Sequence, residues 1–187
     1  MRTGSRWRMC LTNALAALAL CVAGATCAQP SPPASLEYAI KATYLYKLAP
    51  FVEWPPPAFA SKRAPFVICI VGDNPFDGYL TRAVAGRRFG THPFAVRRLR
   101  TLEGGHGCRI VFISGLHDAH LRRTLAAVAG RPVLTVTDST IDPDMPSVIH
   151  FVIEKGHVRF DIDLGAAARN DLKLSSKLLH LAVTVRH

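Results

Sequence analysis

Two apolar runs limit most strongly what this chain can fold into: PFVICIV at 65–71 and CRIVFIS at 108–114. Their apolar residues are continuous rather than alternating and include many branched types, which is typical of strands covered on both faces. Turn signals follow each run, Gly72-Asp73-Asn74-Pro75 and Ser114-Gly115. A sheet buried on both faces needs helices on both sides, so the two runs predict an α/β fold.

Segments of helical and strand-like pattern alternate along the rest of the chain. Ser35 is a suitable N-cap for a helix that Pro50 and the prolines at 55–57 would end. The segments 148–153 and 157–162 are predicted to form a hairpin. Further strands are predicted at 94–99, near a sheet edge, and at 132–137, and further helices at 76–85, 118–129 and 164–185. The prediction is a single-domain three-layer α/β sandwich, its sheet mostly parallel with an antiparallel hairpin near the C-terminus.

The N-terminus has the three-part layout of a cleavable secretory signal. Three arginines and no acid precede an apolar run from 11 to 25, and small residues follow it. We expect cleavage after Ala28, with Ala25 as the alternative site. The run is short of the roughly 20 apolar residues that a membrane span requires, which disfavours an uncleaved anchor. Thr26 before Cys27 disfavours a lipoprotein. The predicted organisation is a signal peptide at 1–28, a Pro-rich leader at 29–34 and one domain at 35–187.

Removal of the signal leaves a moderately basic domain. The whole chain has 23 basic and 13 acidic side chains, and the mature part keeps 20 of the basic ones, a net charge of +7. Such a surface suits nucleic acid, anionic lipid or an acidic protein. An exported protein meets little nucleic acid, so a membrane-proximal or protein partner is the better expectation. The charge also fits an ordinary solubilising surface.

Two of the five cysteines, Cys69 and Cys108, remain after cleavage, one in each apolar run. In an oxidising compartment this indicates one disulfide. The bridge would close a loop of about 40 residues and contribute up to roughly 4 kcal/mol in the chain-entropy model. The alternative is a pair of buried thiols that act as small hydrophobic side chains.

No motif in the chain assembles a catalytic centre. The turn at 72–76 lacks the glycine spacing of a phosphate-binding loop, and Asp73 or Asn74 is expected to cap a helix instead. His117 and His120 are three residues apart, but no further ligand at a recognisable spacing follows them. No G-x-S-x-G occurs either. We therefore predict a protein that is not an enzyme and that has neither a metal nor a cofactor.

Four aspartates in the C-terminal half of the chain are expected to have structural roles. Asp142 and Asp144 lie in a proline-containing loop without the twelve-residue calcium pattern. Asp161 and Asp163 alternate along a predicted strand, so their carboxylates share one face and are a possible acid–base pair. Their place just before a helix favours capping and interaction with the helix dipole.

Two longer stretches are similar to the opening and closing signatures of the YfiR-like family. They are YAIKATYLYKLAPFVEWP at 38–55 and VIHFVIEKGHVRFDIDLGAAARNDLKLSSKLLHLAVTV at 148–185. PFVICIVGDNPF and CRIVFIS match the family's two central strands in order. By position, Cys69 and Cys108 correspond to the family's structural disulfide. A second cysteine pair that some members carry near 138–156 is missing here, which puts redox switching through that pair in doubt.

The resemblance implies a small periplasmic regulator, often dimeric, that represses a membrane-bound diguanylate cyclase by binding its periplasmic sensor region. A sensor kinase is an alternative partner, and an outer-membrane lipoprotein is a further one. The second hypothesis is a periplasmic small-ligand-binding module. Its site would be the crevice at the carboxyl ends of the parallel strands, lined by the loops after Val71 and Ile113.

Overall fold

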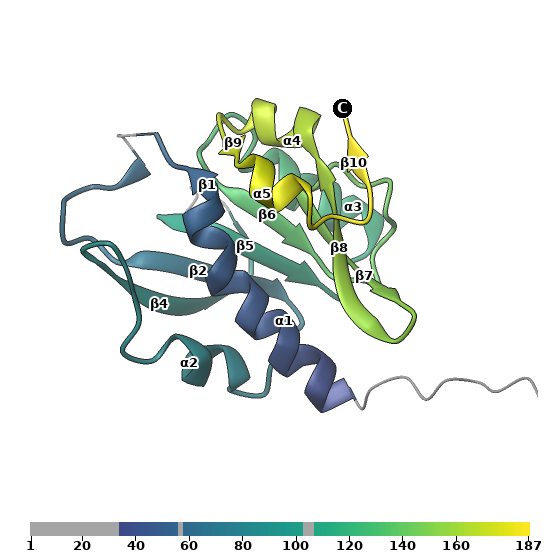
Figure 1. Cartoon of the computed structure of the whole chain (residues 1–187), viewed down its shortest axis with the longest axis horizontal. Helices are drawn as coiled ribbons and strands as arrows, with labels where there is room; N and C mark the ends of the chain where they lie inside the picture. The colour runs from purple at the N-terminus through teal and green to yellow at the C-terminus, as the bar shows by residue number, and fades with distance from the viewer. Residues whose placement is uncertain (1–33, 56–57, 103–106) are drawn as a thin grey trace, which may run out of the picture.

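A central sheet of eight strands organises the part of the chain that the computed structural model describes, residues 34–187 without 56–57 and 103–106 (Figure 1). The strand order is β10-β8-β7-β6-β5-β2-β4-β3. Antiparallel pairs are β7–β8 and β3–β4, and the other neighbours are parallel. The strands are β2 Phe66–Gly72, β3 Arg88–Phe89, β4 His92–Leu99, β5 Cys108–Ser114, β6 Leu134–Thr137, β7 Ile149–Glu154, β8 His157–Asp163 and β10 Val185–Arg186. The mostly parallel α/β fold and its late hairpin are confirmed.

Helices cover this sheet on both faces. The helices are α1 Ala34–Leu48, continued by the 3-10 turn η1 Ala49–Phe51, then α2 Tyr79–Val84, α3 Asp118–Ala126, α4 Leu164–Arg169 and α5 Ser176–Leu179. In Figure 1, α1 runs diagonally across the sheet, and α4 and α5 lie near its upper end. A second, two-stranded sheet joins β1 Val52–Glu53 to β9 Lys173–Leu174 beside them.

The side chains of the central strands alternate between two separate cores, which explains their continuous apolar sequence. Phe66, Ile68 and Ile70 of β2 pack with α1 and α2. Val67, Cys69 and Val71 pack on the other face with Leu121 and Leu125 of α3. All six β2 side chains are buried. Each β2 residue from 66 to 71 therefore contributes to a core, and none is left to face water.

A disulfide joins Cys69 of β2 to Cys108 at the start of β5. The two Cα atoms are 5.8 Å apart, within the range that the bond requires. Both residues are fully buried in the core under α3. The β2–β5 register shifts between Val67 and Ile68. The bridge therefore links directly neighbouring strands at the centre of the sheet.

The C-terminal region contradicts the single helix predicted over 164–185. The chain forms α4, then β9, α5 and β10 instead. Asp171 has a φ of 53°, which ends the helical path, and the side chain of the buried Asn170 donates to the Val133 carbonyl at 2.8 Å. Ser175 then caps α5 by accepting from the Leu178 N–H at 3.3 Å. Pairing of β9 with β1 and of β10 with β8 outweighs the helical spacing of the leucines.

Several helix boundaries in the structure also differ from the predicted ones. The first helix begins at Ala34, so Ser35 lies inside its first turn and is not the N-cap. Asp73 and Asn74 do not cap α2, because that helix begins at Tyr79 after Gly78, and Asn74 accepts instead from the Phe76 N–H. The strand at 94–99 lies next to the edge strand, as predicted. The predicted signal at 1–28 and residues 29–33 of the predicted leader lie outside the described residues.

We expect removal of the disulfide to lower the free energy of unfolding measurably. Replacing both cysteines by alanine, Cys69→Ala with Cys108→Ala, should lower the free energy of unfolding by about 4 kcal/mol, since the unfolded chain is freed of a loop closure. Urea denaturation of both proteins checks this, with dithiothreitol affecting the wild type alone. Two alkylated thiols in the unreduced, denatured wild type, detected by mass spectrometry, would contradict the bridge.

Candidate binding site

The loops after Val71 and Ile113 do not line an open crevice between them. The Asp73 N–H donates to the Ser114 carbonyl at 3.0 Å, and the Ser114 hydroxyl donates back to the Asp73 carbonyl at 2.8 Å. A Cβ at Gly72 would lie 2.0 Å from the Ser114 carbonyl oxygen, and Gly72 has a φ of +86°. Only glycine fits this close approach. The predicted ligand crevice is therefore closed at this point by the two loops themselves.

The histidine pair predicted as a weak metal candidate lies on the surface. His117 precedes α3 without capping it, and both His117 and His120 are exposed. Asp118 between them pairs with Arg122 one turn along α3, at 3.6 Å. Within the described residues, no three His, Cys, Asp or Glu side chains are grouped in a way that would hold a metal ion.

The aspartates singled out in the sequence serve the backbone. The Asp163 carboxylate accepts from the Ala166 N–H at 2.6 Å, which caps α4 as predicted. Asp161 accepts from the Thr184 N–H at 3.0 Å. In the loop, Asp142 accepts from the Asp144 N–H at 2.9 Å, and Asp144 pairs with Arg186 at 3.3 Å. Three of these four carboxylates therefore accept from backbone N–H groups, and the fourth, that of Asp144, pairs with an arginine side chain.

A buried charge cluster at the start of α1 was not predicted from the sequence. Lys41 is fully buried, and its ammonium group pairs with Asp138, which follows β6, and with Glu37 one turn back on α1. The ammonium group also donates to the Ser139 hydroxyl at 3.0 Å. The second Asp138 oxygen accepts from the Tyr38 hydroxyl at 2.8 Å. Burial, together with the hydrogen bond to Asp138, raises the pKa of Tyr38 well above its ordinary value.

A buried histidine lies beside the same end of β6. His150 of β7 is 4% exposed, and its Nδ1 atom is 2.9 Å from the Thr137 hydroxyl, which in turn contacts the Ser147 hydroxyl at 2.7 Å. Burial lowers the pKa of His150 below its usual value. Together with the Lys41 cluster, these side chains surround the carboxyl end of β6 and the start of β7 with paired polar groups.

The sequence does contain a signal for the Lys41 cluster. Lys41 lies between Tyr38 and Leu45 on the face of α1 that packs on the sheet, where a lysine is not expected unless a carboxylate neutralises it. Asp138 follows the buried strand β6 directly, and the fold places the second turn of α1 beside it. The spacing of Tyr38, Lys41 and Leu45 places a lysine on the apolar face of the helix, but only the packing shows which acid it meets.

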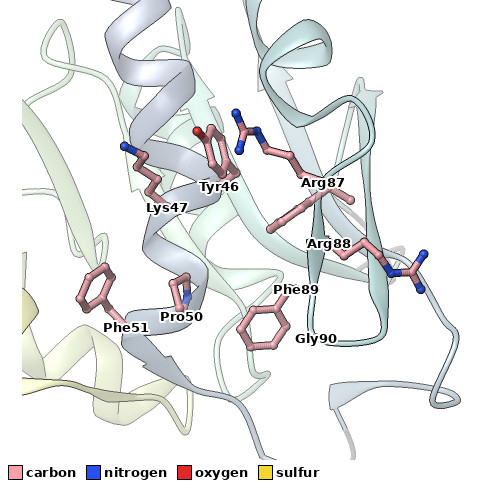
Figure 2. Close-up of a pocket in the computed structure, with 9 residues that line it drawn as sticks. Tyr46, Lys47, Pro50, Phe51, Arg87, Arg88, Phe89 and Gly90 are labelled. Carbon is pink, nitrogen blue, oxygen red and sulfur yellow. The ribbon is translucent and has the colours of Figure 1, made fainter.

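A cavity lies between the C-terminal end of α1 and the β3–β4 hairpin (Figure 2). Its volume is about 620 Å³. Aromatic rings contribute much of its wall. Phe89 packs on the buried Phe66 with ring centroids 5.2 Å apart, and Phe94 meets Tyr46 edge-on at 6.2 Å. The lining residues are Tyr46, Lys47, Pro50, Phe51, Arg87, Arg88, Phe89, Gly90 and Phe94.

Three cations and no acid belong to this lining. Figure 2 shows Arg87 beside Tyr46, and its guanidinium carbon lies 4.8 Å from the Tyr46 ring centroid. The Arg87 Nε atom also donates to the Ala83 carbonyl at 2.7 Å, which fixes its side chain. Arg88 donates to the Thr91 carbonyl, and Lys47 is exposed on α1. Aromatic walls with cations at the rim suit an anion that carries an apolar or aromatic part.

The described residues form a small α/β domain with a disulfide between two central strands. A family model described as YfiR/HmsC-like matches residues 38–183, which is most of the chain. The protein therefore belongs to the YfiR/HmsC-like family, as the resemblance in its sequence indicated. No curated protein matches the chain. Across residues 34–187, where the structure describes them, no helix has both the length and the apolar character needed to cross a membrane.

The charge cluster leads to a prediction about stability. Lys41→Met should lower the free energy of unfolding by about 3–5 kcal/mol, because it leaves the Asp138 carboxylate buried without its cation. Adding Asp138→Asn should restore much of that loss, since the amide still accepts from Tyr38 without carrying a charge. Urea denaturation measures all three proteins.

Lys47→Met is the matched control, because Lys47 is exposed on the same helix. We expect a change within about 0.5 kcal/mol for it. A Lys41→Met variant as stable as this control would show that the cluster contributes nothing to the fold.

Proposed function

We propose that this protein is a non-enzymatic periplasmic regulator that binds and represses a membrane-bound signalling protein, a diguanylate cyclase in the first place. Membership of the YfiR/HmsC-like family carries this proposal. The predicted export signal agrees with it, and so does the disulfide, which is stable in an oxidising compartment. The two aspartates considered as an acid–base pair accept backbone hydrogen bonds instead: Asp163 caps α4, and Asp161 accepts from the Thr184 N–H.

Repression requires that the protein reach the periplasm and meet its partner there. Deletion of the gene should raise cellular cyclic di-GMP and biofilm formation, and the intact gene supplied in trans should lower both again. A version without residues 1–28 should be made but fail to restore repression, because it stays in the cytoplasm. Cyclic di-GMP is measured by mass spectrometry of cell extracts.

Immunoblots of periplasmic and cytoplasmic fractions are the control for this experiment. They verify that both versions accumulate and where each one lies. Unchanged cyclic di-GMP after deletion, across several growth conditions, would contradict the proposed function.

A small-ligand-binding module is the second candidate, and the cavity of Figure 2 is the observation that favours it. Its place differs from the one expected from the sequence, since it lies beside the β3–β4 hairpin and not between the loops after Val71 and Ile113. Its wall of rings and its cationic rim would select an organic anion over a neutral analogue of the same shape.

Thermal unfolding with a panel of aromatic carboxylates tests this second function. A ligand present at a hundred times its dissociation constant stabilises the folded protein by about 2.7 kcal/mol. Arg87→Ala should abolish the rise in melting temperature, and Arg122→Ala on α3 should leave it unchanged. Equal rises for a carboxylate and its uncharged amide would contradict an anion site.

A further inference from the structure

One edge of the sheet is covered by a strand over only part of its length. β3 pairs with β4 at two positions, Arg88 with Pro93 and Phe89 with His92. β4 continues to Leu99, and in the described chain no strand pairs with residues 94–99 on that side. An edge without a neighbouring strand presents backbone donors and acceptors to another chain.

The direction of these backbone groups follows from one hydrogen bond. The Phe94 N–H donates to the Arg87 carbonyl at 3.1 Å, on the side of β4 away from β2. Backbone groups alternate in direction along a strand, so the N–H and C=O groups of Val96 and Arg98 point to that same side. Two successive hydrogen-bonding positions of β4 are thus oriented toward the edge.

Three hollows lie along the same strand. The cavity of Figure 2 includes Phe94, a smaller one of about 140 Å³ includes Val96 and Arg98, and one of about 490 Å³ includes Arg98, Leu99 and Arg100. Segments that add a strand to a sheet edge gain specificity from hollows that receive alternate side chains. By their β4 residues the hollows follow one another from Phe94 to Leu99, and the middle one is also lined by Leu80 and Thr81 of α2.

Charge decides which segment fits. Arg88 lies at one end of this edge, and Arg98 and Arg100 lie at the other, all three exposed. None of the described residues that line the three hollows is acidic. A second copy of the chain along this edge would place arginine opposite arginine, and like charges opposite one another destabilise strand pairs. The edge therefore favours an acidic segment over a second copy.

We propose that the open edge of β4 binds an extended acidic segment of a protein partner, which adds a strand to the sheet beside Val96 and Arg98. The inference rests on the proposed function only in assigning that segment to the membrane-bound partner. The physical claim is that an acidic strand pairs here, and it is testable on the purified exported protein without knowledge of the partner.

An eight-residue peptide that alternates glutamate with valine is the probe, and its lysine counterpart is the control peptide. The glutamate peptide should slow hydrogen exchange of the Val96 and Arg98 amides, as seen by NMR, and bind more weakly as salt is added. The lysine peptide should do neither. Unprotected amides at millimolar glutamate peptide would overturn the proposal, as would equal binding of the two peptides.

Arg98→Pro removes the outward N–H at a site where an edge strand tolerates proline. Arg98→Ala removes the same side chain and keeps the N–H. Affinity for the glutamate peptide should be at least about tenfold lower for Arg98→Pro than for Arg98→Ala, the loss of a hydrogen bond of roughly 1.4 kcal/mol. Equal affinities would overturn pairing by the backbone. If Arg98→Pro fails to fold, Arg98→Glu replaces it and should move the preference toward the lysine peptide; an unchanged preference would overturn the charge argument.

Complementation of a deletion strain distinguishes failure of this inference from failure of the proposed function. In a deletion strain, wild type and Arg122→Ala should lower cyclic di-GMP, and Arg98→Pro should not. Repression by Arg98→Pro equal to that by Arg122→Ala would overturn the edge as the partner site. If wild type itself leaves cyclic di-GMP unchanged, the proposed function fails, and the peptide result alone decides the edge. Protection of both amides in the free protein, together with a dimer in sedimentation, would assign the edge to a second copy and overturn the proposal.

Discussion

The pairing of Lys41 with Asp138 fixes how α1 lies across the sheet, and much of the molecule depends on that position. Two charges away from water are costly unless they meet with good geometry, so the helix has few alternative places. Tyr38 and Lys41 attach the second turn of α1 to the end of β6, and the C-terminal end of the helix reaches the β3–β4 hairpin, where Tyr46 meets Phe94 and Arg87. The ion pair at the middle of the helix thus helps to position the cavity wall at its C-terminal end.

Most of the fold was predictable because a continuous apolar strand has only one environment that suits it. The runs at 65–71 and 108–114 gave the central strands, and the turn at 154–156 gave the hairpin. The end of the chain was mispredicted because its leucines have helical spacing, whereas Asp171 turns the backbone and β9 finds a partner in β1, more than a hundred residues earlier. Periodicity describes local preference and carries no information on such a distant partner.

The sites were less predictable than the fold for the same reason. The pairing of Cys69 with Cys108 could be predicted, because the predicted signal cleavage leaves only these two cysteines and both lie in buried strands. The cavity combines residues 46–51 with residues 87–94, and only the packing of α1 beside the hairpin brings these segments together. The predicted crevice between the loops after Val71 and Ile113 is absent from the described chain. Gly72 makes a contact too close for any side chain, and this contact lets the two loops hydrogen-bond to each other.

The disulfide has a further consequence that concerns the enclosed segment rather than stability. Everything between Cys69 and Cys108 belongs to one covalent loop, and that loop contains α2, β3 and β4. A protease that cut the chain once within this loop would not separate the two pieces, because the bridge would still hold them together. One wall of the cavity and the open strand edge therefore lie on a segment that stays covalently attached at both sides of a single cut.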